Sequence, residues 1–278
     1  MDIYKYSSTP RPLDKKYLTN RIIGLAVPLV IIGSFLYQLV TGTGLLDALL
    51  WGTGGGLVVF LSWALCREMD PDNDYSALLA AIFSLAGIFL LGIQGIPVMI
   101  LYLFSARILV RTTGIKAKWA DSVLLLLLGT WIAFTVHGIF LLTVFTIFIL
   151  DAILKAPLKK QYIFAVLSLL VFFGGLITGE FNLWEGTFFY YQAIAGTLLA
   201  LLFVPVIISS RSVRSIGDVT GKKLQGIRLQ LILILLIISG LLHAIIDGDK
   251  GLAFLFPFWA CVTGIVVYRA FKFLWYKI

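Results

Sequence analysis

Apolar runs close to 20 residues long recur along this whole 278-residue chain. A hydrophobic stretch of about 20 residues is long enough to cross a bilayer as a helix. Membrane-spanning β-strands would instead alternate in polarity over segments of about 10 residues, which these continuous runs do not do. Because a bilayer admits only helices and closed barrels, the sequence predicts an all-α polytopic transmembrane helical bundle.

The charge content agrees with a membrane protein whose main partner is the lipid bilayer. Only 13% of the residues are charged, about half the roughly 25% of a soluble domain. The net charge of +8 does not indicate nucleic-acid binding, because the basic residues lie singly or in short groups between the apolar runs. Cys66 and Cys261 lie near or within apolar runs and indicate no disulfide framework.

Polar interruptions divide the chain into a basic cytosolic N-terminal tail at residues 1–21 and a single transmembrane domain at residues 22–278. Residues 119–154 are few for two spans, but one helix there would reverse the sidedness of everything downstream. We therefore expect a turn at His137 and Gly138. The expected spans, ten in all, lie at about residues 22–40, 45–66, 76–93, 96–110, 120–136, 138–154, 162–178, 187–209, 229–246 and 252–270.

The distribution of basic residues orients these spans. In the ten-span arrangement every Lys and Arg except Lys250 falls on the same side of the membrane. Short cytosolic loops are enriched in Lys and Arg. The sequence thus predicts a multi-pass protein of the cell membrane with both termini cytosolic.

Two basic connectors have matching residues at an offset of 107 positions in the sequence. The echo suggests that spans 3–6 are duplicated as spans 7–10, and an even number of spans makes a parallel internal repeat of helical hairpins. The alternative is coincidence among short loops that favour Thr, Gly and Lys. The matching residues are Arg107, Thr113, Gly114 and Lys116 in the first connector and Arg214, Thr220, Gly221 and Lys223 in the second.

The connector at residues 67–75 is the main candidate for chemistry. Asp70, Asp72 and Asp74 alternate in it, and carboxylate oxygens are the ligands that Mg²⁺ and Ca²⁺ prefer. These three residues are therefore the candidate metal ligands, with Mg²⁺ as the candidate cofactor. The structural alternative is a turn at Asp70-Pro71, with Asp74 or Ser76 capping the next helix.

Charged residues at other predicted cytosolic helix ends extend this candidate site. Arg107 and Arg111 follow the fourth span, and guanidinium groups bind phosphate well. Asp121 and Asp151 lie one turn inside the fifth and sixth spans. We take these four residues as candidate ligand-binding residues, which we expect to meet the acidic loop. Arg107 could instead extend to the membrane interface without binding a ligand.

Three functions remain open on this basis. The first is binding or processing of a phosphorylated lipid or polyprenyl headgroup at the cytosolic interface. The second is a small-molecule transporter built from parallel repeats, and the third is a non-catalytic membrane scaffold. His137 and His243 lie near predicted outer helix ends, a placement that favours a structural role over a proton relay. No hydrolase or ATPase motif is present, so the sequence assigns no catalytic residue, and it leaves the oligomeric state undefined.

Overall fold

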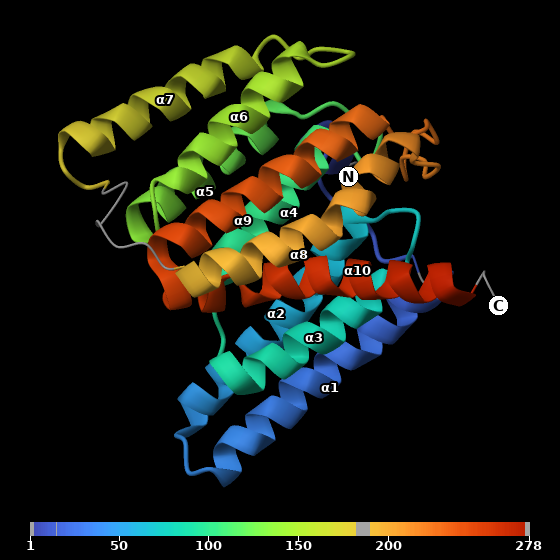
Figure 1. Ribbon diagram of the computed structural model, residues 1–278, viewed down its shortest axis with the longest axis vertical. Coiled ribbons are helices and arrows are strands. Elements are labelled where there is room, and N and C mark those ends of the chain that lie inside the picture. Colours follow the sequence, from blue (N-terminus) through green and yellow to red (C-terminus); the bar gives the residue numbers. More distant parts are fainter. Residues whose placement is uncertain (1–2, 15, 182–189, 276–278) are drawn as a thin grey trace. The chain divides into compact units, whose positions relative to one another are not determined.

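The computed structural model describes residues 3–14, 16–181 and 190–275, and within these ranges its regular elements are helices (Figure 1). An isolated β-bridge joins Ile216 and Lys223. Short 3₁₀ helices cover Ile3–Lys5 and Ser210–Ser212. The α-helices are α1 (Leu18–Val40), α2 (Leu45–Met69), α3 (Ser76–Leu91), α4 (Ile96–Val110), α5 (Trp119–Thr135), α6 (Ile139–Ile153), α7 (Gln161–Ile177), α8 (Tyr190–Ser209), α9 (Gly226–Phe254) and α10 (Phe256–Trp275).

Most helices begin and end close to the predicted positions. α4 has the predicted bounds, and α5 and α6 are separate helices joined at residues 136–138, as the expected turn at His137 and Gly138 requires. The polar interruptions thus located the helices well. The first residues of the predicted span 187–209 lie outside the described residues.

The last two helices differ from the prediction. The expected turn at residues 247–250 is a break inside α9, where Gly248 takes φ 58° and ψ −130°. Helical structure then continues to Phe254, and α10 begins at Phe256 rather than near residue 252. Proline fits the first turn of a helix because its missing N–H has no partner to lose there. Pro257 holds such a position in α10.

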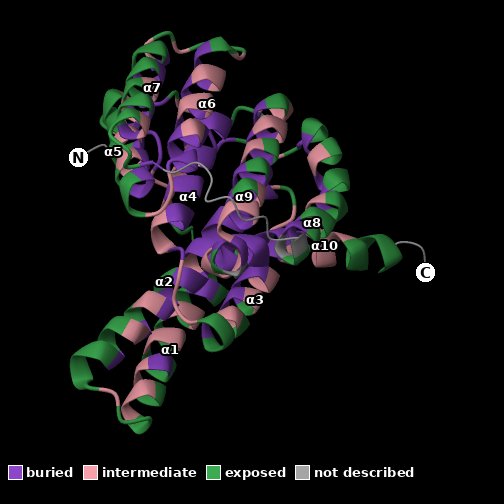
Figure 2. Ribbon diagram, turned by 60° about the vertical axis from the view of Figure 1, so that its left-hand side comes forward, coloured by how far each residue is buried: buried purple, intermediate pink, exposed green. Residues whose placement is uncertain are grey.

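Five helices in the described part of the chain are long and apolar enough to cross a membrane: α1, α2, α8, α9 and α10. α3 to α7 are also apolar but have only 15–17 residues. The chain therefore has the helices of a membrane protein. Along α1 most of the apolar side chains are exposed (Figure 2), as expected for a surface that faces lipid.

The described chain divides into two compact units. Unit 1 comprises Met1–Arg11 and Leu101–Leu252, and unit 2 comprises Pro12–Ile100 and Ala253–Ile278. Since α4 and α9 each continue from one unit into the other, this division does not decide whether the chain is one transmembrane domain. That prediction, like the parallel repeat, stays a prediction.

Close backbone contacts hold unit 2 together. α10 packs on α3 and α2, and α1 packs on α2. A Cβ added to Gly264 of α10 would lie 2.7 Å from the backbone nitrogen of Ala80 in α3. A Cβ added to Gly52 of α2 would lie 2.7 Å from the carbonyl oxygen of Ile31 in α1. Glycine at such positions lets two membrane helices approach closely.

Unit 1 places α6 against both α5 and α7. Its core is largely aromatic and aliphatic, with Tyr102, Phe140, Phe148 and Phe203 fully buried. Charged side chains are also buried here, at the end of the unit where α4 and α6 finish and α9 begins. This is the end that the sequence predicts to face the cytosol.

Candidate functional site

Asp151 lies in the last turn of α6 and is completely buried. After the helix ends, the chain turns back with Ala156 at φ 60°, and the amide of Leu158 donates to the carbonyl of Asp151 over 3.1 Å. This reversal brings the carbonyl groups of Lys155 and Ala156 close to the carboxylate. A buried carboxylate requires cations or hydrogen-bond donors around it.

Two arginines and an amide supply those donors. Arg111 donates from Nη2 to Oδ1 of Asp151 over 2.7 Å, and Arg228 donates from Nη1 to the same oxygen over 2.6 Å. Gln161, the first residue of α7, donates to Oδ2 over 3.1 Å and accepts a hydrogen bond from Ser122 of α5. The carboxylate therefore links α4, α6, α7 and α9.

Most of the other N–H groups of Arg111 and Arg228 donate hydrogen bonds to carbonyl oxygens. The fully buried Arg228 donates to the carbonyls of Leu109 and Lys155, each over 3.0 Å. Arg111 donates to the carbonyl of Ala156 over 3.0 Å. Its backbone has φ 59°, unusual for a residue other than glycine. Its Nε is a buried donor without a hydrogen-bond partner within the described residues.

Positive charge exceeds negative charge around this cluster. Arg111 and Arg228 share the single carboxylate of Asp151, and Lys160 lies nearby with its Nζ 5.0 Å from the ring centroid of Trp119. Partial burial lowers the pKa of Lys160, and Lys118 acts in the same direction. Asp121 and Asp151 oppose that shift.

Asp121 holds the N-terminal tail on the same unit. Its carboxylate accepts hydrogen bonds from the hydroxyls of Ser7 and Ser8, at 2.5 and 2.7 Å, and from the amide of Ser8 at 2.9 Å. It also accepts from the amide of Lys118 at 2.7 Å, which closes the first turn of α5. Asp121 is therefore saturated with donors and is completely buried.

Further contacts fix the tail on both sides of Asp121. Arg107 donates from Nη1 to the carbonyl of Thr9 over 3.1 Å, and Thr113 donates to the carbonyl of Ser8 over 2.8 Å. Arg11 forms a two-pronged contact with Asp218. The four predicted ligand-binding residues thus separate into two pairs: Arg107 and Asp121 bind the tail, whereas Arg111 and Asp151 bind each other.

The two basic connectors that echo each other in sequence are in direct contact. Residues 215–224 form a hairpin whose Asp218 and Thr220 amides donate to the carbonyls of Thr112 and Thr113, at 3.1 and 3.2 Å. Gly114 and Gly221 occupy matching places in the echo, and both have positive φ, 81° and 63°. The shared backbone conformation is compatible with duplication.

The acidic loop lies in unit 2 and is bound mainly by arginines. Asp70 is buried and accepts from Arg269 of α10 at Nε (3.2 Å) and Nη2 (2.7 Å), and from Asn73 at 2.9 Å. Asp74 pairs with Arg67 at 3.2 Å. The partners found within this unit are therefore Arg269 and Arg67, whereas the sequence led us to expect Arg107 or Arg111.

The acidic loop was considered as a cap for the next helix or as a metal site. α3 begins without a side-chain cap on Tyr75, so the capping role expected for Asp74 or Ser76 is wrong; Ser76 instead donates to the carbonyl of Asn73 over 2.7 Å. In the described part of the chain no group of three or more His, Cys, Asp or Glu side chains could hold a metal ion. The magnesium site at Asp70, Asp72 and Asp74 stays a prediction.

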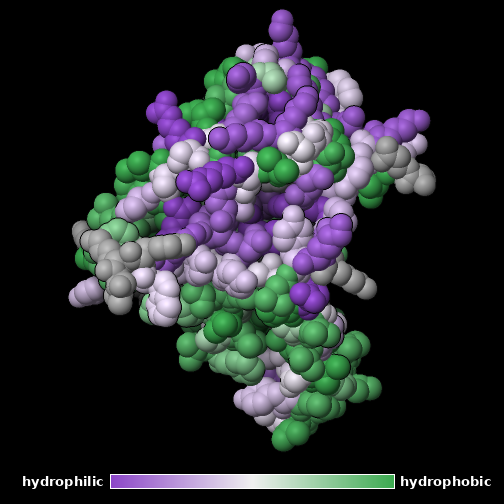
Figure 3. Space-filling model, turned by 90° about the vertical axis from the view of Figure 1, so that its right-hand side faces the viewer, coloured by the Kyte–Doolittle hydropathy of each residue, from purple (hydrophilic) through white to green (hydrophobic). Residues whose placement is uncertain are grey.

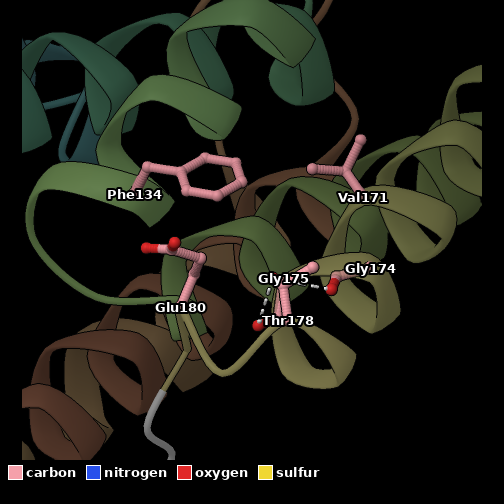
Figure 4. A pocket seen from close by; sticks show the side chains of 6 residues that line it. All are labelled: Phe134, Val171, Gly174, Gly175, Thr178 and Glu180. Carbon is pink, nitrogen blue, oxygen red and sulfur yellow. Dashed lines mark hydrogen bonds between the residues drawn. The ribbon is translucent and has the colours of Figure 1, made fainter.

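A shallow hollow of about 570 Å³ opens at the other end of unit 1, beside the C-terminal part of α7. Figure 4 shows the carboxylate of Glu180 and the ring of Phe134 on one side, with Val171 opposite. The hydroxyl of Thr178 is directed back to the carbonyls of Gly174 and Gly175. The hollow is thus separated from the arginine cluster by the length of α7.

Sequence reasoning missed Arg228, Gln161 and the serines of the tail. Arg228 was counted only as a cytosolic charge; in the structure it precedes the buried Ile232 and Leu236 by four and eight residues on the same helix. That helical spacing puts it on a buried face, since Ile232 and Leu236 are fully buried. Comparisons with protein-family models, curated proteins and solved structures found no match to this chain.

Proposed function

We propose that the chain crosses the cell membrane ten times with both termini in the cytosol. Connectors assigned to the same side of the membrane touch each other within each unit, which supports this arrangement. On the cytosolic side of unit 1, residues 112–113 bind the 215–224 hairpin. On the outer side, Phe181 packs on Gly138. In unit 2, Asp70 binds Arg269 at the inner end.

The short helices α3 to α7 are compatible with spanning. A helix of 15–17 residues is about 23–26 Å long, only a few Å shorter than a hydrocarbon core of about 30 Å. Local thinning of the bilayer or flanking polar residues accommodate such a mismatch at modest cost. We therefore assign these helices as full spans.

We further propose that the cytosolic face of unit 1 binds a phosphorylated lipid headgroup. The observation that carries this proposal is the ratio of two buried guanidinium groups, Arg111 and Arg228, to one carboxylate, Asp151. A cluster with excess positive charge attracts an anion, and the low dielectric around buried groups strengthens that Coulomb attraction. Lysines of the adjoining connectors extend the positive surface: Lys116, Lys118, Lys155, Lys159 and Lys160.

A headgroup is favoured over a soluble anion by the position of the cluster. The apolar helices α4 and α6 end, and α9 begins, at this basic surface, which is the level at which lipid phosphates lie. Figure 3 views the molecule from the side where hydrophilic side chains gather. Polybasic segments next to membrane helices attract anionic lipid at about 1 kcal/mol per basic residue.

Thermal unfolding of the purified protein in a neutral detergent tests the proposal. A ligand that binds only the folded state raises the unfolding midpoint. Short-chain phosphatidic acid should raise the midpoint, and phosphatidylcholine should not. The double variant Lys159→Gln, Lys160→Gln should lose most of this rise, whereas Lys250→Gln, on the predicted outer side, should keep it.

The other outcomes are equally specific. A rise with inorganic phosphate alone would assign the site to a free phosphate. Equal midpoints in phosphatidic acid and phosphatidylcholine would refute headgroup binding altogether.

A further inference from the structure

One face of α9 carries three polar residues, each one turn from the next: Ser239, His243 and Asp247. A spacing of four residues places side chains on the same side of a helix. Ser239 and His243 are buried, with 2% and 3% of their surface exposed. The Asp247 side chain is 31% exposed. The row therefore leads from a carboxylate that reaches solvent into the core of unit 1.

His243 and Asp247 are in direct contact. Nδ1 of His243 lies 2.7 Å from Oδ2 of Asp247. The ring of His137, in the turn before α6, lies 6.3 Å from the His243 ring between centroids, and the Phe140 ring lies at 5.1 Å. An imidazole beside a carboxylate can hold a proton as an ion pair, and the aromatic ring reduces the access of water to it.

In the part of the chain that the structure describes, few other charged side chains face this pair. His137 is the second titratable group that faces it, and Glu180 and Lys250 are exposed. The helical segments that contact this face of α9 through Tyr102, Phe140 and Thr143 contain no Asp, Glu, Lys, Arg or His: they are residues 101–106 of α4 and 139–146 of α6.

A buried group of hydroxyls lies one turn further along the same face. Tyr102 of α4 donates to the hydroxyl of Ser239 over 2.9 Å, and Thr143 of α6 does so over 2.9 Å. All three side chains are buried. Because hydroxyl groups both donate and accept, the row of polar groups continues beyond His243 toward the middle of the unit.

Whereas the sequence favours a structural role for His243, we propose that His243 and Asp247 form a proton-binding site that exchanges with water at the outer end of unit 1. The partly exposed carboxylate is the entrance, and the buried imidazole holds the proton. In the described part of the chain no third His, Cys, Asp or Glu joins them to make a metal site. Ionisable residues within a membrane commonly mark proton or ion pathways, and chains of Asp, Glu and His serve as proton relays in transporters. The proposal depends on the membrane location but not on headgroup binding.

Nuclear magnetic resonance of the full chain tests this site directly, because the sequence contains only two histidines. With histidine labelled with ¹³C at Cε1 alone, in detergent micelles, His137→Gln leaves a single imidazole signal, that of His243. Imidazole groups in water titrate between pH 5 and 8. We expect this signal to respond to pH, and we expect Asp247→Asn, in the same background, to change that response.

Ser239→Ala is the matched control, since it removes a polar group one turn away and leaves the carboxylate in place. It should preserve the titration seen with Asp247 intact. A His243 signal that does not change between pH 5 and 8 would overturn the proposal, and so would a titration that Asp247→Asn leaves unaltered. If His137→Gln fails to fold, Asp247→Asn in the wild-type background still shows which of the two histidine signals depends on the carboxylate. Loss of lipid binding would leave these results unaffected.

Discussion

Arg228 and Asp151 form an ion pair 2.6 Å long in which neither side chain has any exposed surface. Arg111 shares the same carboxylate oxygen at 2.7 Å. The pair joins the start of α9 to the end of α6. Arg228 also donates to the carbonyls of Leu109 and Lys155 and, from Nε, to Oε1 of Gln225. Removing one partner of such a pair leaves a buried charge without compensation, whereas removing a surface charge does not.

Replacing Asp151 should be more harmful than replacing Arg228. Asp151→Asn leaves two buried guanidinium groups without a counter-ion, which we expect to cost about 3–5 kcal/mol of unfolding free energy. Arg228→Met leaves Arg111 paired with Asp151, so we expect a loss of only about 1–3 kcal/mol from the missing hydrogen bonds. Unfolding in mixed micelles measures both. The reverse order would contradict the assignment of Asp151 as the centre of the cluster.

The acidic loop offers a matched pair of substitutions. Asp70→Asn breaks the bidentate contact with Arg269 and should destabilise the protein by about 1–3 kcal/mol. Asp72→Asn changes an exposed side chain and should alter stability by less than about 0.5 kcal/mol. Thermal unfolding in millimolar Mg²⁺ and in chelator gives the comparison. Equal effects of the two variants, together with a midpoint that falls in chelator, would favour the magnesium site instead.

Much of the fold could be predicted because each connector carries residues that lipid does not admit. α4 and the division between α5 and α6 follow from charges, glycines and one histidine. The start of α10 could not be found in this way, because residues 251–258 are uniformly apolar. Only Pro257 indicated the first turn of the helix.

The residues of the candidate site were predicted from the sequence, but the contacts between them were not. Arg107, Arg111, Asp121 and Asp151 are all found in unit 1, but the sequence did not reveal which of them bind each other. Apolar residues occupy nearly every position of a membrane helix, so hydrophobic periodicity does not identify the buried face. The role of Arg228 follows only from the arrangement of α4, α6 and α9 around Asp151.

The contact between the two echoing connectors depends on Gly114. A Cβ at this position would lie 1.7 Å from Oγ1 of Thr220 and would also be strained at φ 81°. Gly221 has φ 63°, but a Cβ there would meet nothing within 4 Å. Gly221→Ala should therefore cost about 1–2 kcal/mol, from the left-handed conformation alone. Gly114→Ala should reduce the unfolding free energy by more than Gly221→Ala does. Adding Thr220→Gly to Gly114→Ala should restore part of the difference. Equal unfolding free energies for the two alanine variants would argue against this packing.

Single cysteines should report the proposed sidedness. Lys116, Lys159 and Lys222 are exposed in connectors assigned to the cytosol, and Thr41 and Lys250 are exposed on the outer side. The native Cys66 and Cys261 are buried and should react little with a membrane-impermeant maleimide. In intact cells we expect labelling of Thr41→Cys and Lys250→Cys alone. Opposite results for Lys116→Cys and Lys159→Cys would show that α5 and α6 do not both cross the membrane.

The N-terminal tail should be bound less tightly to unit 1 when Asp121 loses its charge. Hydrogen bonds to a charged acceptor contribute about 1.5–3 kcal/mol, and Asp121 accepts two such bonds from Ser8. Each 1.4 kcal/mol is a factor of about ten in an equilibrium constant. Amide hydrogen exchange at Ser8 should therefore be at least about tenfold faster in Asp121→Asn. Asp14→Asn, an exposed acid on the same tail, should leave it unchanged. Unaltered exchange in Asp121→Asn would mean that Arg107, Thr113 and the Arg11–Asp218 pair hold the tail by themselves.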